Sequence, residues 1–102
     1  MSKSIIPGGN DKKCWICNKL GYETTRNLHK HHIIYGRGRR KLAEHYGLTV
    51  YLCIVHHEDG THGVHQGNLQ WNSHLKRYAQ QMFEEKEGTR EDFIRIFGKS
   101  YL

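Results

Sequence analysis

Three histidines lie together in the segment 29–34, which reads His-Lys-His-His-Ile-Ile. A neutral imidazole can bind a metal ion through its free ring nitrogen, and it can also accept a proton near neutral pH. The adjacent His31 and His32 therefore offer a metal ligand and a proton acceptor within one short run. The alternative is a surface cluster of histidines without chemistry, which is the usual state of an isolated His-His pair.

The three cysteines fall into two matching groups of metal ligands. Cys14 and Cys17 form a Cys-x-x-Cys pair, and Cys53 with His56 repeats the same spacing. Three thiolates and one imidazole make a tetrahedral set that is typical of structural zinc. The alternatives are free thiols, His57 as the fourth ligand, or a redox pair, which would need a βαβ context that the sequence lacks. We therefore predict a structural Zn2+ bound by Cys14, Cys17, Cys53 and His56.

The remaining histidines are harder to assign from the sequence. His62 and His65 lie in a glycine-containing segment, where one of them could complete a second metal site or face solvent. We prefer His65 for the metal site. His29, His45 and His74 are assigned to the surface or to packing.

Positive charge is concentrated in the first part of the chain. Residues 1–41 carry ten Lys and Arg against two acidic residues, residues 42–102 carry six against eight, and the net charge is +6. This asymmetry predicts a polyanionic partner, most simply nucleic acid. The segment after the histidine pair is the most basic, and the side chains expected to bind DNA phosphates are Arg37, Arg39, Arg40 and Lys41. The alternative is a solvated charged face.

Length and composition indicate one small domain of 102 residues with 36% hydrophobic content. A bound metal ion can add folding stability to a domain of this size, because its hydrophobic core is small. We expect residues 1–13, which are polar and contain Pro7-Gly8-Gly9, to form a flexible basic arm before a domain over 14–102. The sequence has no run of ~20 apolar residues and no signal-peptide core, so we expect a cytoplasmic protein without a membrane partner.

The pattern of residues predicts an α+β fold. Strands are expected over 27–34 and 48–52, and between them a helix over 39–46 that ends at Gly47. After His57, the glycines leave room only for a short or broken helical turn.

Two helices are expected in the last third of the chain. An apolar stripe predicts the first, which begins at Asn72 or Ser73 and ends at Gly88. Thr89 and Asp92 resemble a capping box that begins the second helix, and Gly98 ends it.

The order of these motifs resembles that of the HNH endonucleases. A Cys-x-x-Cys pair, then His31-His32-Ile33, then an aliphatic strand into Leu52-Cys53-x-x-His56-His57 is similar to the small phage-type members, over about residues 14–65. The ending over 96–102, Ile-Phe-Gly-Lys-Ser-Tyr-Leu, is also similar to small phage nucleases. The resemblance implies a ββα-metal core with a zinc knuckle and C-terminal helices.

Carried over to this chain, the resemblance makes His31 and His57 ligands of a catalytic metal and His32 the general base. His65 is our choice for a further ligand of that metal. The middle Asn of the family should fall near residues 48–49, where the chain has Leu and Thr. The hydrogen bond that orients His32 must therefore come from elsewhere, for example from a backbone carbonyl. The fourth zinc ligand, usually cysteine, is His56 here.

The function implied is a metal-dependent DNA endonuclease that leaves 3′-hydroxyl and 5′-phosphate ends. Imidazole ligands favour Mn2+, Co2+, Ni2+ or Zn2+ as the catalytic ion, although phosphate and water can recruit Mg2+. The resemblance also suggests a phage-encoded protein in the bacterial host cytoplasm, with phage packaging or recombination proteins as further partners. The rival hypothesis is a non-catalytic zinc-ribbon module that binds nucleic acid.

Overall fold

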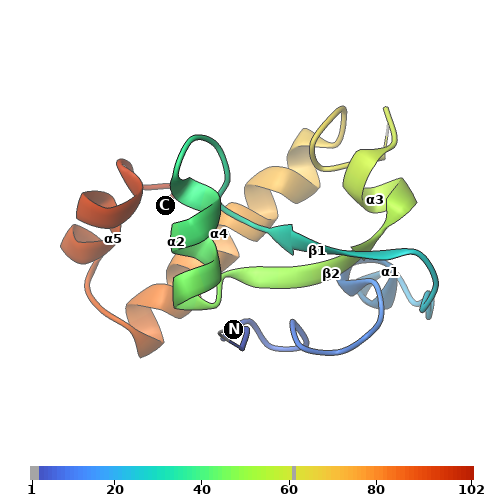
Figure 1. Cartoon of the computed structure of the whole chain (residues 1–102), viewed down its shortest axis with the longest axis horizontal. Helices are drawn as coiled ribbons and strands as arrows, with labels where there is room; N and C mark the ends of the chain where they lie inside the picture. Colours follow the sequence, from blue (N-terminus) through green and yellow to red (C-terminus); the bar gives the residue numbers. More distant parts are fainter. Residues whose placement is uncertain (1–2, 61) are drawn as a thin grey trace.

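A short antiparallel sheet runs through the middle of the molecule in a computed structural model that describes residues 3–60 and 62–102 (Figure 1). The α+β fold predicted from the sequence is confirmed at this level. In chain order, the elements are α1 (Trp15–Lys19), β1 (Leu28–His32), α2 (Arg39–Tyr46), β2 (Thr49–Cys53), α3 (Ile54–Glu58), α4 (Leu69–Lys86) and α5 (Arg90–Phe97).

The register of the sheet separates the two adjacent histidines. His31 pairs with Val50, and His32 pairs with Thr49 at the last position of β1. Successive side chains of a strand point to opposite faces. The His31 side chain is accordingly buried, with 0% exposure, whereas His32 is partly exposed. The two adjacent histidines therefore lie in different surroundings at the end of β1.

The α2 helix lies between the two strands in sequence and ends as predicted. Gly47 follows it with a φ of 73°, a left-handed conformation that favours glycine. A Cβ at this position would also collide with the backbone oxygen of Lys3. These two constraints fix the turn that leads from α2 into β2.

The long helix begins earlier than the sequence predicted. The Asn68 side chain caps α4 by accepting a hydrogen bond from the backbone N–H of Trp71 at 3.2 Å, so the predicted start at Asn72 or Ser73 is wrong. The apolar stripe does not reveal this first turn because Leu69 is 68% exposed. The capping box of α5 is confirmed, since Thr89 and Asp92 bond each other's backbone N–H groups.

The ends of the sheet are covered by different helices. At one end lie α2, α4 and α5 (Figure 1). Phe83 of α4 there contacts the rings of Tyr46, Phe93 and Phe97. At the other end, α1 and α3 lie against the strands. None of the helices in residues 3–60 and 62–102 has the length and hydropathy needed to cross a membrane.

The N-terminal segment differs from the flexible arm expected over 1–13. Ile6 is buried in the core, and the backbone N–H of Ile5 donates to the carbonyl of Gly47 at 2.9 Å. The Trp15 indole N–H donates to the carbonyl of Pro7, also at 2.9 Å. Residues 3–13 therefore pack against the domain, because Ile5 and Ile6 anchor them on the core, and residues 1–2 of the predicted arm lie outside the described residues.

Candidate metal centres

Four predicted ligands meet between α1, the end of β2 and α3. This cysteine cluster comprises Cys14, Cys17, Cys53 and His56. The Nδ1 atom of His56 lies 3.7, 3.3 and 3.4 Å from the Sγ atoms of Cys14, Cys17 and Cys53 respectively. A tetrahedral zinc site with Zn–S bonds of about 2.3 Å and Zn–N bonds of about 2.0 Å has N···S edges of roughly 3.5 Å and S···S edges of roughly 3.8 Å. Both fit, since the Sγ atoms of Cys17 and Cys53 are 3.8 Å apart. The cluster could therefore hold a metal ion such as zinc.

Local structure explains why these four side chains converge. Cys14 is the N-cap of α1, and the backbone N–H of Cys17 points to its Sγ atom at 3.4 Å. Cys53 ends β2 and is the N-cap of α3, so His56 follows within the first turn of that helix. Each x-x spacing thus becomes one helical turn, which returns both ligands to the same side.

The surroundings of the cysteine cluster favour neutral groups unless a cation is bound. Burial is the main reason that the pKa of the Cys14 thiol rises to about 12. Burial also lowers the pKa of His56, which keeps its imidazole in the neutral form that coordinates metals. A cation bound here would stabilise the thiolates that burial disfavours.

A second set of possible ligands includes His57, the residue of α3 that follows His56. This histidine cluster comprises His31 from β1, His57 from α3 and His65 from the following loop. The Nε2 atoms of His57 and His65 are 3.1 Å apart. Metal–nitrogen bonds of about 2.0–2.1 Å would place tetrahedral ligands roughly 3.3 Å apart, so the separation fits a shared ion.

The buried His31 is the most informative member of the histidine cluster. Both of its ring nitrogens are buried, and neither has a hydrogen-bond partner in the described part of the chain. An unsatisfied buried polar group costs about 1–3 kcal/mol, so a ligand that satisfies it would stabilise the fold. Burial, followed by the neighbouring His65 and His57, lowers the pKa of His31 well below its usual range. The imidazole is thus held neutral and ready to coordinate.

His57 is oriented by His29, which the sequence analysis assigns to the surface or to packing. Its Nδ1 atom lies 2.9 Å from Nδ1 of His29, which leaves Nε2 directed toward His65. Burial, with smaller effects of His65 and His29, lowers the pKa of His57 to about 4. His29, His57 and Glu58 also form an alternative group of three possible ligands. The available signal for His29 was its i, i+2 spacing from His31, since alternate residues of a strand lie on the same face.

His32 stands apart from both clusters and has a carboxylate partner. Its Nε2 atom lies 2.9 Å from Oε1 of Glu44 on α2, and Oε2 of Glu44 accepts a hydrogen bond from Lys30 at 2.8 Å. The bonds from Lys30 and His32 lower the pKa of Glu44. A side-chain carboxylate therefore holds the ring, where the sequence analysis suggested a backbone carbonyl. The pairing depends on how α2 packs over β1, so no sequence spacing could reveal it.

The histidine cluster opens onto a hollow in the surface. A pocket of about 350 Å3 is lined by His32, His57, His65, Tyr35, Arg40, Lys30, Gly36 and Glu58. A neighbouring hollow of about 650 Å3 shares His32 and Arg40 and adds Lys41 and Glu44. Of the predicted basic residues, Arg40 and Lys41 thus border the site. Arg37 lines neither hollow, and Arg39 turns away to donate to the carbonyl of Phe97 at 3.0 Å.

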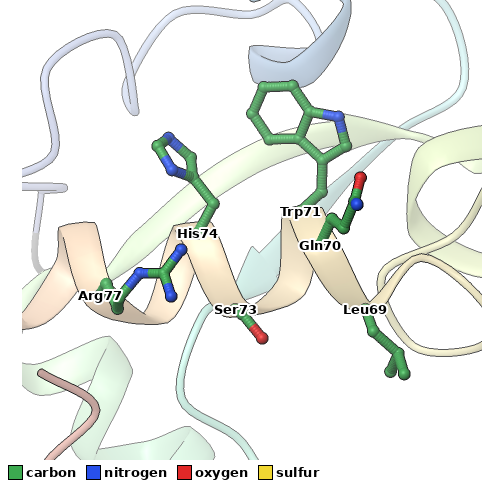
Figure 2. A pocket seen from close by; sticks show the side chains of 6 residues that line it. All are labelled: Leu69, Gln70, Trp71, Ser73, His74 and Arg77. Atoms are coloured by element: carbon green, nitrogen blue, oxygen red, sulfur yellow. The ribbon is translucent and has the colours of Figure 1, made fainter.

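A third hollow lies along α4, away from the histidine cluster in its lining residues. Its volume is about 670 Å3, and its lining comprises Leu69, Gln70, Trp71, Ser73, His74 and Arg77 (Figure 2). It shares no residue with the two hollows beside His32, and none of its residues belongs to a possible metal group. Size alone therefore does not mark the chemical site, and we place it at the histidine cluster.

Comparison with protein-family models, with curated proteins and with solved structures gives no match.

Proposed function

We propose that the chain is a metal-dependent DNA endonuclease of the HNH type, with β1, β2 and α3 as its ββα-metal core. The observation that carries this proposal is the arrangement around His31. Its unpaired buried ring lies beside His57 and His65, while the adjacent His32 faces the pocket and is held by Glu44. A ligand set beside a separately oriented base suits hydrolysis, whereas a module that only binds needs no such pair.

We assign different ions to the two clusters. The cysteine cluster fits a structural Zn2+, because it is closed by four protein ligands. The histidine cluster offers three ligands beside a pocket, which leaves room for substrate. A divalent ion bound there would act as a Lewis acid on the phosphate and stabilise the leaving oxygen. Imidazole ligands favour Mn2+, Co2+, Ni2+ or Zn2+, and phosphate and water could recruit Mg2+.

His32 is the proposed general base. Because the carboxylate of Glu44 can only accept, the proton of the neutral imidazole is assigned to Nε2, which leaves the lone pair on Nδ1. Nδ1 then takes a proton from the water that attacks phosphorus. The P–O3′ bond breaks, the 3′ oxygen takes a proton from solvent water, and the products are a 3′-hydroxyl and a 5′-phosphate.

The basic side chains beside the pocket would hold the DNA. Arg40 lines both hollows next to His32, and Lys41 lines one of them, so both can reach phosphates near the scissile bond. Contacts of this kind carry no sequence information, so we expect weak sequence specificity. The phage source and the packaging or recombination partners stay predictions from the resemblance.

Cleavage of supercoiled plasmid tests the proposal. Wild-type protein should cut when Mn2+, Co2+, Ni2+ or Mg2+ is added, and EDTA should stop cleavage. His32→Ala should keep DNA affinity and metal content but lose about 10²- to 10⁴-fold in rate, because the proton acceptor is gone. Intact plasmid under every metal tried, with normal DNA binding, would favour the zinc-ribbon module. If His32→Ala cut at the wild-type rate, the role of His32 would be wrong.

A further inference from the structure

Three cationic side chains from distant parts of the chain meet at the C-terminal tail, where two lysines lie against one tyrosine ring and an arginine donates to the carbonyl of Phe97 at 3.0 Å. They are Arg39 at the start of α2, Lys76 on α4 and Lys99 in the C-terminal tail. The Nζ atom of Lys76 lies 4.6 Å from the ring centroid of Tyr35 and 5.3 Å from that of Tyr101. The Nζ atom of Lys99 lies 5.1 Å from the Tyr101 ring. Both lysines therefore share one aromatic ring.

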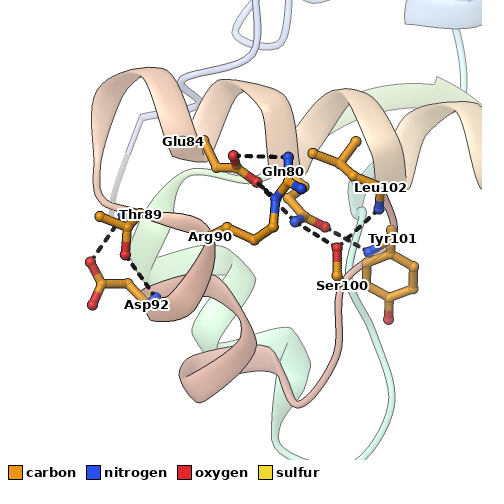
Figure 3. Close-up of polar contacts among 8 residues, drawn as sticks. All are labelled: Gln80, Glu84, Thr89, Arg90, Asp92, Ser100, Tyr101 and Leu102. Carbon is orange, nitrogen blue, oxygen red and sulfur yellow. Dashed lines mark hydrogen bonds and ion pairs between the residues drawn. The ribbon is translucent and has the colours of Figure 1, made fainter.

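The positions of the tail residues are set by a buried side chain. Gln80 on α4 has 0% exposure; its Oε1 accepts from the backbone N–H of Tyr101 at 2.7 Å, and its Nε2 donates to Oγ of Ser100 at 3.0 Å (Figure 3). Gln80 lies one helical turn after Lys76. The same helix thus presents Lys76 and holds the tail that carries Lys99.

The charge of this group is not compensated by the protein. In residues 3–60 and 62–102, none of the three cations forms an ion pair with a carboxylate. Burial, then Lys99, then Arg39 lower the pKa of Lys76, and no acidic group opposes this. Aromatic rings order a cation without neutralising it. An anion bound here would relieve the repulsion.

The cations adjoin the proposed catalytic site through Tyr35. The Tyr35 ring centroid lies 4.5 Å from that of His65, and its hydroxyl accepts a hydrogen bond from Asn72 at 3.1 Å. Tyr35 thus lines the histidine pocket, and its ring also lies against Nζ of Lys76. An anion on the cations would lie beside a phosphate in the pocket.

We propose that Arg39, Lys76 and Lys99 form a second phosphate subsite, which binds a backbone phosphate of the DNA strand next to the scissile one. This inference rests on the proposed function for the identity of the polyanion. It gives the C-terminal tail a role in substrate binding and explains why Arg39 turns away from the pocket.

The salt dependence of DNA binding tests the subsite. Binding of the full-length protein to a short fluorescent duplex is followed by anisotropy without added divalent cation. Lys76→Gln with Lys99→Gln should flatten the slope of log K against log salt by up to about 1.8, since each phosphate contact contributes about 0.9. The matched control is Arg26→Gln with Arg77→Gln, which removes two exposed positive charges elsewhere and should change the slope little. Far-UV circular dichroism and Tm show that each variant is folded.

Several outcomes separate this proposal from the endonuclease itself. A slope equal to that of the wild type or of the control would overturn the subsite, even if plasmid is cut. Absence of duplex binding by the wild type would overturn it as well. A flattened slope in a protein that cuts nothing would support the subsite while the endonuclease proposal fails. If a 5′-mononucleotide bound in a lysine-dependent way while the duplex slope stayed unchanged, the ligand would be a free nucleotide and the DNA assignment would be wrong.

Discussion

The cysteine cluster and the histidine cluster meet at one short helix, because His56 belongs to the first and His57 to the second. The cysteine ligands are buried and face one another, with His56 closing the set. In the histidine cluster, His31 is buried, whereas His57 and His65 border a pocket that is also lined by His32 and Arg40. A closed set of four ligands suits a structural ion, whereas an open set of three suits a reacting one.

The shared helix makes the two clusters unequal. Removal of the cysteine cluster would release α3 from α1, and with it His57. Removal of the histidine cluster would leave the cysteine ligands in place, since none of them depends on His31 or His65. We therefore predict that loss of the cysteine cluster also disrupts the histidine cluster, whereas loss of the histidine cluster leaves the cysteine cluster intact.

The largest effect should follow from breaking the closed cluster. Cys53→Ser should unfold or aggregate the protein, because a structural zinc contributes several kcal/mol or more of folding free energy in a small domain. The measurements are thermal unfolding by circular dichroism and zinc content by elemental analysis. A folded Cys53→Ser protein with the wild-type Tm would remove the structural role of this cluster.

A smaller effect should follow from removing the carboxylate that orients His32, the proposed general base beside the histidine cluster. Glu44→Ala removes the acceptor that holds Nε2 of His32, and we expect a loss of about 10- to 100-fold in cleavage rate, the usual effect of a partner that orients a functional side chain. Single-turnover cleavage at saturating protein measures this loss. Glu85→Ala is the matched control, since it removes an exposed carboxylate from α4. Equal rates for the two variants would show that Glu44 does not position the base.

The smallest effect should come from a region remote from both clusters. Thr89→Ala removes the side-chain cap of α5, which typically costs about 1 kcal/mol of stability, or roughly 4–8 °C in Tm for a domain of this size. Metal content and cleavage rate should stay at wild-type values. A change in either would mean that α5 supports the site more directly than its contacts indicate.

Most of the correct predictions from the sequence came from local patterns, such as ligand spacings and helix-ending residues. The x-x spacings of Cys14 with Cys17 and of Cys53 with His56 place ligands one helical turn apart, whatever the rest of the chain does. Gly47 likewise ends α2 through its own backbone conformation. Within the histidine cluster, the residues themselves suggested His31 and His65, whereas His57 could be anticipated only through the resemblance, because the three ligands come from a strand, a helix and a loop.

The residues that were missed depend on packing between distant elements. Glu44 reaches His32 only because α2 lies over β1, and Lys99 approaches Lys76 only because Gln80 holds the tail. The start of α4 was missed for a local reason, since its exposed first turn breaks the apolar stripe. The burial of Ile6 was missed because the pair Ile5-Ile6 is too short to give a periodic signal.

Cobalt titration of the metal-free protein tests the central claim that two chemically different metal sites exist. Thiolate ligands give Co2+ an intense charge-transfer absorption, which imidazole and water ligands do not. We predict two bound equivalents for the wild type, of which only the thiolate-rich one gives this absorption. His31→Ala should keep that absorption and lose the other equivalent. A single equivalent in the wild type, or loss of both in a folded His31→Ala protein, would contradict the account.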